Sequence, residues 1–221
     1  MLALNLPQDG RAPLKVLCLG SHSDDIEIGC GGTILRLLSC NQNIEVVWVV
    51  FSSSKERERE ARDSAELFLE QAKRKEIIVN NFRDGFFPFE GERIKDFFEG
   101  LKKISPDLIL THSRKDAHQD HRLIVELTWN TFRDHLILEY EIPKYDGDMG
   151  QPSTFVTLEP EVCQRKVGYI MDAFKSQRTK RWFQKDTFMS LMRLRGMECN
   201  APSGYAEAFY CRKLVVSVER P

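Results

Sequence analysis

Residues 14–51, LKVLCLGSHSDDIEIGCGGTILRLLSCNQNIEVVWVVF, set the architecture of this chain. The stretch opens and closes on short, nearly continuous apolar runs at 14–20 and 44–51, which are typical of strands covered on both faces of a sheet. Between them, GGTILRLLSC (31–40) spaces its apolar residues as a helix does. A strand, a helix and a second strand in this order predict a βαβ unit with parallel strands.

The same alternation continues along the chain. Further strands are predicted at 76–82, 106–113, 136–142, 153–158 and 205–218. Further helices are predicted at 55–71, 93–104, 120–132 and 160–174, the last of which opens with a proline in its first turn. We therefore expect one α/β domain over residues 1–221, with a parallel sheet flanked by helices.

Composition excludes several classes of partner. The chain has 221 residues, of which 42% are hydrophobic and 29% charged, and this composition suits one large domain. Its formal net charge of −1 provides no basic field that would attract nucleic acid or an anionic membrane surface. No stretch approaches the roughly 20 apolar residues that cross a bilayer, and MLALNLPQDGRAPLK (1–15) resembles neither a signal peptide nor an anchor. Six cysteines without a C-x-x-C pair indicate reduced thiols in a cytoplasmic protein, with no catalytic role.

Two polar clusters follow the ends of predicted strands. SHSDD (21–25) follows the first strand, and SRKDAHQDH (113–121) follows the strand that ends near His112. In a parallel sheet, ligands bind outside the carboxyl ends of the strands, so both clusters are expected at the same edge. Together they offer His22, Asp24, Asp25, His118, Asp120 and His121.

This set of side chains is sufficient for a zinc hydrolase site. Such a site needs three nitrogen or oxygen ligands, a fourth position open to water, and a nearby group that takes the proton of that water. Asp24 and Asp25 are adjacent and cannot easily both point at one ion, so one is expected as a ligand and its neighbour as a base. His118 and His121 lie one helical turn apart, so one could bind metal while the other faces the reacting carbonyl.

Simpler structural interpretations apply to several of these features. A lone aspartate at position 24 or 25 would be an ordinary helix N-cap, but a pair beside His22 and a second cluster favours a functional role. Gly29, Gly31 and Gly32 lack the G-x-G-x-x-G spacing, so close helix packing is favoured over a nucleotide cofactor. His112 and His135 are left outside the predicted site. GFFPFEG (85–91) is interpreted mainly as packing, with a lid over the pocket as the alternative.

HSDDIEIGCGGT (22–33) resembles the first signature of the PIG-L/LmbE deacetylases, usually written A-H-P-D-D-E, and HQDH (118–121) resembles the second, H-P-D-H. Weaker fragments occur in the family's order along the chain: RERE (57–60), FRDG (82–85), KSQ (175–177) and YAEAF (205–209). The resemblance implies a Rossmann-like, mostly parallel sheet. It also implies removal of the N-acetyl group of an amino sugar, such as N-acetylglucosamine, or of its conjugate, with a metal-bound water as nucleophile.

The resemblance also implies roles for individual residues. The ligands of one divalent ion, zinc or alternatively ferrous iron, would be His22, Asp25 and His121. Asp24 would be the general base, His118 would stabilise the oxyanion or protonate the leaving amine, and Asp120 would orient or tune His118. Arg57 would bind substrate, with Arg59 as the alternative within RERE. The chain departs from the family pattern in two places: Ser23 replaces a proline, and Ile26 separates Asp25 from Glu27.

Three classes of function follow from these residues. The first is the deacetylase, acting on a small-molecule amino sugar or nucleotide sugar. The basic segment KSQRTKRWFQK (175–185) is interpreted as a solvated helix face, and it would meet a phosphate if the substrate is a nucleotide sugar. The second is a non-haem iron oxygenase, because two histidines and one carboxylate also describe its metal site. The third is a catalytically silent sugar-binding protein. The base Asp24 disfavours the last two. A homo-oligomer is compatible with all three.

Overall fold

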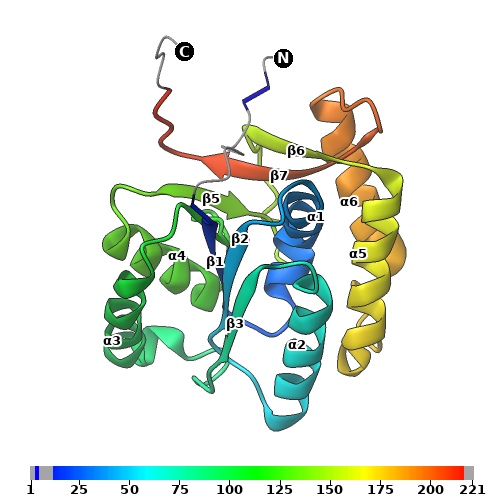
Figure 1. The fold of residues 1–221 in the computed structure, drawn as a ribbon. Helices are drawn as coiled ribbons and strands as arrows, with labels where there is room; N and C mark the ends of the chain where they lie inside the picture. Colours follow the sequence, from blue (N-terminus) through cyan, green and yellow to red (C-terminus); the bar gives the residue numbers. More distant parts are fainter. Residues whose placement is uncertain (1–2, 5–11, 217–221) are drawn as a thin grey trace.

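The computed structural model describes residues 3–4 and 12–216. Within these residues, seven strands form one sheet in the order β3-β2-β1-β4-β5-β7-β6 (Figure 1). The strands are β1 (Leu14–Gly20), β2 (Ile44–Val50), β3 (Arg74–Val79), β4 (Leu108–His112), β5 (Leu136–Tyr140), β6 (Thr154–Leu158) and β7 (Tyr205–Cys211). The helices are α1 (Asp25–Cys40), α2 (Lys55–Phe68), α3 (Gly91–Leu101), α4 (Gln119–Thr131), α5 (Pro160–Ala173) and α6 (Lys185–Glu198).

The sheet is mostly parallel, as predicted. Strands β1 to β5 pair in parallel, and the order β3-β2-β1-β4-β5 is that of Rossmann-type sheets. Strand β7 pairs antiparallel with both β5 and β6, and β6 is the edge strand on this side of the sheet. Because β1 and β4 are direct neighbours, in register from Val16 opposite Leu108, their carboxyl ends meet at one edge of the sheet. That edge carries the two polar clusters.

Two apolar layers hold the sheet between helices. Helices α3 and α4 cover one face, and α1, α2 and α5 cover the other, with α6 beside α5 (Figure 1). Successive side chains of β1 point to opposite faces, so Val16 and Cys18 join the core beneath α1 while Leu17 and Leu19 join the core beneath α4. The continuous apolar run of β1 is explained by burial on both faces.

The structure corrects several sequence-based boundaries. Helix α1 begins at Asp25 rather than at residue 31. Three glycines in its first two turns lie where an added Cβ would overlap neighbouring side chains. Segment 175–185 was expected as a solvated helix face, but it is not a helix. It forms a 3-10 turn at Lys175–Gln177 and then a loop. The Glu60 carboxylate accepts hydrogen bonds from the backbone N–H and from the hydroxyl of Ser176. The strand expected at 205–218 ends at Cys211, and residues 217–218 lie outside the described part of the chain.

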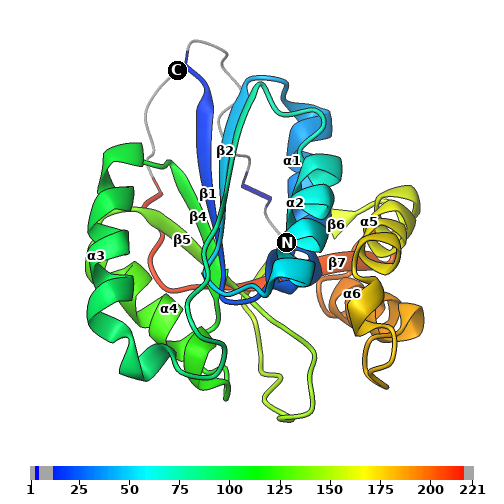
Figure 2. The same cartoon turned by 90° about the horizontal axis from the view of Figure 1, so that it is seen from below.

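Helix α6 was not predicted. Its apolar residues do not follow a clean stripe, because Phe188 and Met192 are buried whereas Leu194 and Met197 are exposed. Among the described helices, none combines the length and the apolar character needed to cross a membrane. Figure 2 shows the loop between β5 and β6, residues 141–153, extending beneath the strands at the carboxyl edge of the sheet.

Candidate metal centre

The turn between β1 and α1 places three predicted site residues at the edge of the sheet. His22, Asp24 and Asp25 are all buried there. Asp25 Oδ2 accepts the backbone N–H of His22 at 2.7 Å, which closes the turn. Asp24 occupies the N-cap position of α1, but its side chain makes no capping hydrogen bond. Its Oδ1 instead accepts a hydrogen bond from Arg57 Nη2 at 2.8 Å, so the interpretation of Asp24 as an ordinary cap does not hold.

Helix α4 brings the second cluster to the same place. His118 is the N-cap residue of α4, and its Nδ1 accepts the backbone N–H of Asp120 at 3.2 Å. His121 follows in the first turn and faces the β1 turn. Its Nε2 lies 3.2 Å from His22 Nδ1, although the two residues are 99 positions apart in the chain. The structure therefore brings together the two clusters that were expected to meet.

Three donor atoms form a nearly equilateral triangle. His22 Nδ1 lies 3.2 Å from His121 Nε2 and 3.4 Å from Asp25 Oδ2, and the third side, between His121 Nε2 and Asp25 Oδ2, is 3.5 Å. Tetrahedral coordination with bonds of about 2.0–2.2 Å separates neighbouring ligand atoms by about 3.3–3.6 Å. The three predicted ligands thus fit a small divalent ion, and the triangle leaves further coordination positions for water or substrate.

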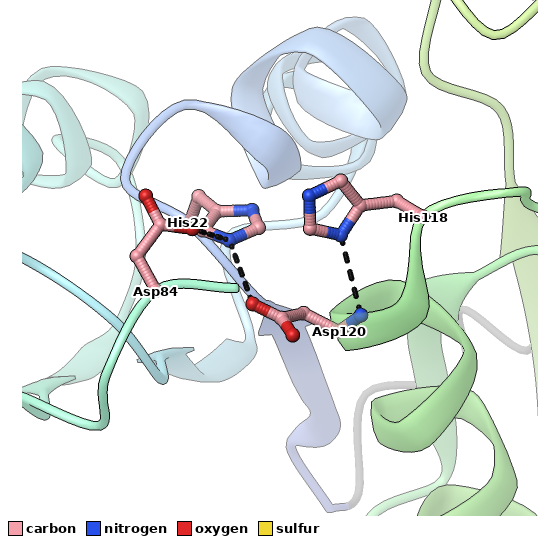
Figure 3. A group of neighbouring side chains, drawn as sticks. All are labelled: His22, Asp84, His118 and Asp120. Carbon is pink, nitrogen blue, oxygen red and sulfur yellow. Dashed lines mark hydrogen bonds and ion pairs between the residues drawn. The ribbon is translucent and has the colours of Figure 1, made fainter. Parts of the chain in front are cut away.

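Carboxylates lie behind the outer nitrogens of both histidines. His121 Nδ1 is 2.8 Å from Asp116 Oδ2. His22 Nε2 is 3.0 Å from Asp84 Oδ1 and 3.4 Å from Asp120 Oδ2 (Figure 3). Metal-binding histidines commonly donate their second N–H to a carboxylate, which fixes the ring orientation and strengthens the ligand. Both rings therefore have the surroundings of a metal ligand.

A second group of donors, His22, Asp84, His118 and Asp120, shares His22 with the triangle (Figure 3). Its carboxylates are otherwise engaged or exposed: Asp120 accepts the backbone N–H groups of Gly85 and Phe87, at 2.7 and 3.2 Å, and the side chain of Asp84 is 65% exposed. The triangle is buried and its donor atoms converge, so it is the better candidate for the ion. We interpret the second group as its surroundings.

Asp120 was expected to orient His118, and the structure shows a different contact. The Asp120 carboxylate faces His22 and the loop before α3, whereas His118 touches the Asp120 backbone N–H. Because His118 Nδ1 accepts that hydrogen bond, the neutral ring carries its proton on Nε2. Burial and the neighbouring His22 lower the pKa of His118 below its ordinary value, which favours this neutral form.

Arg57, not Arg59, lies at the site. The Arg57 side chain is 19% exposed and pairs with Asp24, whereas the Arg59 side chain is 88% exposed and faces Asp63. Burial raises the pKa of the Asp24 carboxyl above its ordinary value, and the Arg57 guanidinium opposes this shift. Asp24 is thus a buried carboxylate whose pKa is raised by burial and lowered by its arginine partner.

Sequence reasoning missed three residues. His112 is fully buried, lies 3.3 Å from Asp25 Oδ2 and stacks on His121 with ring centroids 3.9 Å apart. Asp116 and Asp84 supply the carboxylates behind His121 and His22. A signal existed for all three, because each closely follows or ends a strand at the carboxyl edge. Glu27, which lies one position beyond the acid of the family signature, is fully buried, and burial raises its pKa well above the ordinary range.

The fold and the site define a class: a Rossmann-type α/β protein with a buried centre of two histidines and one aspartate at the carboxyl edge of its sheet. Residues 17–132 match the model of the PIG-L family, described as GlcNAc-PI de-N-acetylase. The chain belongs to this family. The matched segment contains every residue that the sequence analysis placed in the site.

Individual proteins resemble this chain in sequence or in fold. A diacetylchitobiose deacetylase from Thermococcus kodakarensis is 30% identical over 122 residues, which are 49% of this chain and 45% of that protein. The match thus spans less than half the length of this curated relative. The structure of the conserved protein TT1542 from Thermus thermophilus has a TM-score of 0.75 at 19% identity, covering 94% of this chain and 100% of that one.

A third match shows that the fold alone does not specify the reaction. The 4-carboxy-2-hydroxymuconate hydratase GalB from Pseudomonas putida KT2440 has a TM-score of 0.74 at 16% identity, with 94% of this chain and 100% of that chain covered. Proteins with different named activities therefore share this architecture. The residues of the site, rather than the fold, determine which reaction such a protein performs.

Proposed function

We propose that this protein is a metal-dependent amidohydrolase that removes the N-acetyl group of an amino sugar or of a small amino-sugar conjugate. One observation carries the proposal: the donor atoms of His22, Asp25 and His121 lie within 3.5 Å of one another, beside a buried aspartate that does not cap its helix. Membership of the de-N-acetylase family supports the same reaction.

His22, Asp25 and His121 would hold one divalent ion. Two imidazoles and one carboxylate suit zinc, and they also suit ferrous iron, which is the alternative. When bound, such an ion supplies Lewis acidity, which acidifies water and polarises the amide carbonyl. Asp116, Asp84 and Asp120 hold the two histidine rings in the required orientation.

Asp24 acts as the general base. Its carboxylate accepts a proton from the water that attacks the acetamide carbon, and it passes that proton to the sugar nitrogen as the C–N bond breaks, so acetate and a free amine result. Arg57 holds the Asp24 carboxylate in place. Because the Arg57 side chain is partly exposed, its guanidinium would also donate to a hydroxyl or an anionic group of the substrate.

His118 stabilises the oxyanion. With Nδ1 accepting from the backbone and a lowered pKa, its Nε2–H is a neutral hydrogen-bond donor at pH 7. A donor that carries its proton before the reaction starts can stabilise the developing charge on the carbonyl oxygen. Of the two roles considered for His118, this geometry supports oxyanion stabilisation over protonation of the leaving amine.

Acetate release tests the proposal directly. The full-length protein is incubated under nitrogen with N-acetylglucosamine, N,N′-diacetylchitobiose or UDP-N-acetylglucosamine, and acetate and free amine are measured beside the metal content. We expect equal amounts of acetate and amine from at least one substrate, about one bound ion per chain, and loss of activity with EDTA.

Other results would contradict the proposal. Full activity in metal-free protein would exclude a role for the ion, and turnover that requires oxygen would indicate the oxygenase. Sugar binding without acetate release from any of the three substrates would indicate the silent binding protein.

A further inference from the structure

The loop between β5 and β6, residues 141–153, is anchored at both ends by one arginine. Arg195 of α6 donates to the Glu141 carboxylate from Nε at 2.9 Å and from Nη2 at 2.8 Å. Its Nη2 also donates to the Gly150 carbonyl at 3.0 Å. The two ends of the loop are therefore fixed to α6, independently of what its middle contacts.

The middle of the loop contacts the candidate metal centre through a lysine. The Lys144 side chain is 11% exposed, and its ammonium pairs with two carboxylates: Asp116, with Nζ to Oδ1 at 3.1 Å, and Asp148 within the loop. Asp148 Oδ2 in turn accepts the backbone N–H of Ala117 at 2.6 Å. Lys144 and Asp148 thus attach the loop to residues 116–118.

Asp116 links this attachment to two site residues. Its Oδ2 lies 2.8 Å from His121 Nδ1, and its Oδ1 accepts the backbone N–H of His118 at 2.8 Å. The buried Asp116 carboxylate therefore contacts three groups at once: the ring of His121, the backbone N–H of His118 and the ammonium of Lys144.

We infer that Lys144 is a positioning residue for the metal centre: it fixes the Asp116 carboxylate, and through it the His121 ring, and so couples the loop at 141–153 to the site. The inference rests on the proposed function in taking His121 as a metal ligand. Removing the ammonium would leave Asp116 and Asp148 as two like charges that share one small volume, and their repulsion would displace the loop and rotate Asp116.

The coupling works in both directions. A change in the loop that weakens metal binding implies that metal binding stabilises the docked loop, because the two free energies are linked. The loop tip is suited to report this, since Tyr145 and Met149 are exposed and bury little apolar surface. Metal binding at His121 should therefore reduce opening of residues 143–149.

Zinc affinity of matched lysine variants tests the inference. Lys144→Met keeps most of the side-chain length and removes the charge, while Lys115→Met removes an exposed lysine of the neighbouring segment and is the control. Zinc dissociation constants of the full chain are measured by competition with a chromogenic chelator. Loss of a carboxylate behind a metal-bound histidine weakens metal binding about 10–100-fold, so we expect the zinc dissociation constant of Asp116→Asn to rise by that factor. For Lys144→Met we expect the zinc dissociation constant to rise about 3–10-fold. Lys115→Met should bind zinc as wild type does.

Two further measurements separate positioning from general damage to the fold. The double variant Lys144→Met/Asp148→Asn removes the repulsion, while the amide oxygen introduced at position 148 can still accept from Ala117, so this variant should regain part of the lost affinity. Hydrogen exchange at 143–149 should slow when zinc is added to wild type and should change less in Lys144→Met.

The outcomes distinguish this inference from the proposed function. Unchanged zinc affinity and unchanged exchange in Lys144→Met, with wild type releasing acetate, would overturn the inference alone. Weakened zinc binding in Lys144→Met, with no acetate released by wild type, would support the inference and overturn the deacetylase proposal. A wild-type protein that binds no zinc and no ferrous iron would overturn both.

Discussion

Asp24 shows how a single position can serve a helix or a site. It is the N-cap residue of α1, where an aspartate ordinarily accepts a hydrogen bond from its own helix. Here its carboxylate pairs with Arg57 and leaves the helix end without that bond. The helix therefore lacks a capping hydrogen bond that would stabilise the folded protein by about 1 kcal/mol. A carboxylate held in this way is available for proton transfer.

Replacing Asp24 by asparagine tests this role. The amide keeps an oxygen that can accept from Arg57, but it cannot take a proton from water, so the chemical step should slow. We expect kcat for acetate release to fall about 10²–10⁴-fold, with zinc content close to that of wild type. Asp63→Asn, at an exposed position on α2, is the control and should leave kcat unchanged. Near wild-type kcat in Asp24→Asn would show that another group is the base.

The two candidate histidine ligands are expected to differ in charge before any ion binds, because their pKa values shift in opposite directions. Burial opposes the charged form of His22, but hydrogen bonds with Asp120, Asp25 and Asp84 raise its pKa well above the ordinary value. Burial and the adjacent His112 lower the pKa of His121 to about 4. We therefore expect His22 to be protonated and His121 to be neutral at neutral pH in the metal-free protein.

Metal binding should therefore release a proton from His22. A ligand nitrogen must be unprotonated, so raising the pH favours binding and lowering it favours the proton. Around pH 7 the logarithm of the zinc association constant should rise with a slope of about one per pH unit, because His22 loses a proton and His121 has none to lose. Zinc titrations between pH 6 and 8 measure this slope. A slope near zero would mean that His22 is neutral in the metal-free protein.

Among the elements, α1 packs against Tyr140 and Leu158 of the sheet at two glycines. A Cβ at Gly29 would lie 2.2 Å from the ring of Tyr140, and one at Gly32 would lie 2.6 Å from Leu158. Tyr140 cannot easily move, because its hydroxyl donates to the Leu19 carbonyl at 2.6 Å. The prediction that these glycines serve packing is confirmed. Since α1 begins at Asp25, its position also sets the position of the β1 turn.

Gly29→Ala should therefore destabilise the protein. The added methyl overlaps a fixed aromatic ring, and we expect the free energy of unfolding to fall by about 1–3 kcal/mol. Gly168→Ala, inside α5 and with open space around the new methyl, should instead raise it by about 0.4–1 kcal/mol. Urea unfolding followed by circular dichroism measures both. Equal effects of the two substitutions would contradict this account of how α1 packs.

Across the molecule as a whole, the site joins distant parts of the chain. His22 and Asp25 follow β1, whereas His121 belongs to α4, and the parallel pairing of β1 with β4 brings them together. Any ion bound by all three would connect these segments in the folded protein and would lose its site on unfolding. Zinc binding should therefore stabilise the whole fold.

Thermal unfolding measures this effect. At a free zinc concentration about 100 times the dissociation constant, the stabilisation is about 2.7 kcal/mol, and for a protein of this size that corresponds to a rise in Tm of about 5–10 °C. His121→Ala should abolish the rise. His135→Ala, which removes a histidine that packs on Phe132 outside the site, should keep it. An equal zinc response in all three proteins would place the ion elsewhere.

Local sequence patterns were enough to predict the order of strands and helices up to α5, a parallel sheet and the meeting of the two polar clusters. Apolar runs such as LKVLCLG (14–20) bury both faces of a strand, and parallel strands bring their carboxyl ends to one edge. The predicted meeting of the clusters that contain His22, Asp25 and His121 followed from that rule, because each cluster follows a strand that ends at this edge. The choice of these three residues as the ligands came from the resemblance to the PIG-L/LmbE family.

The groups that surround those residues became known only from the packed fold. The Asp120 carboxylate faces His22 instead of His118, Asp116 pairs with both His121 and Lys144, and α6 packs as a helix despite an irregular apolar pattern. Such contacts join segments that are distant in the chain. A side chain is directed by the donors and charges that tertiary packing places around it, and the spacing of residues along the chain does not contain that information.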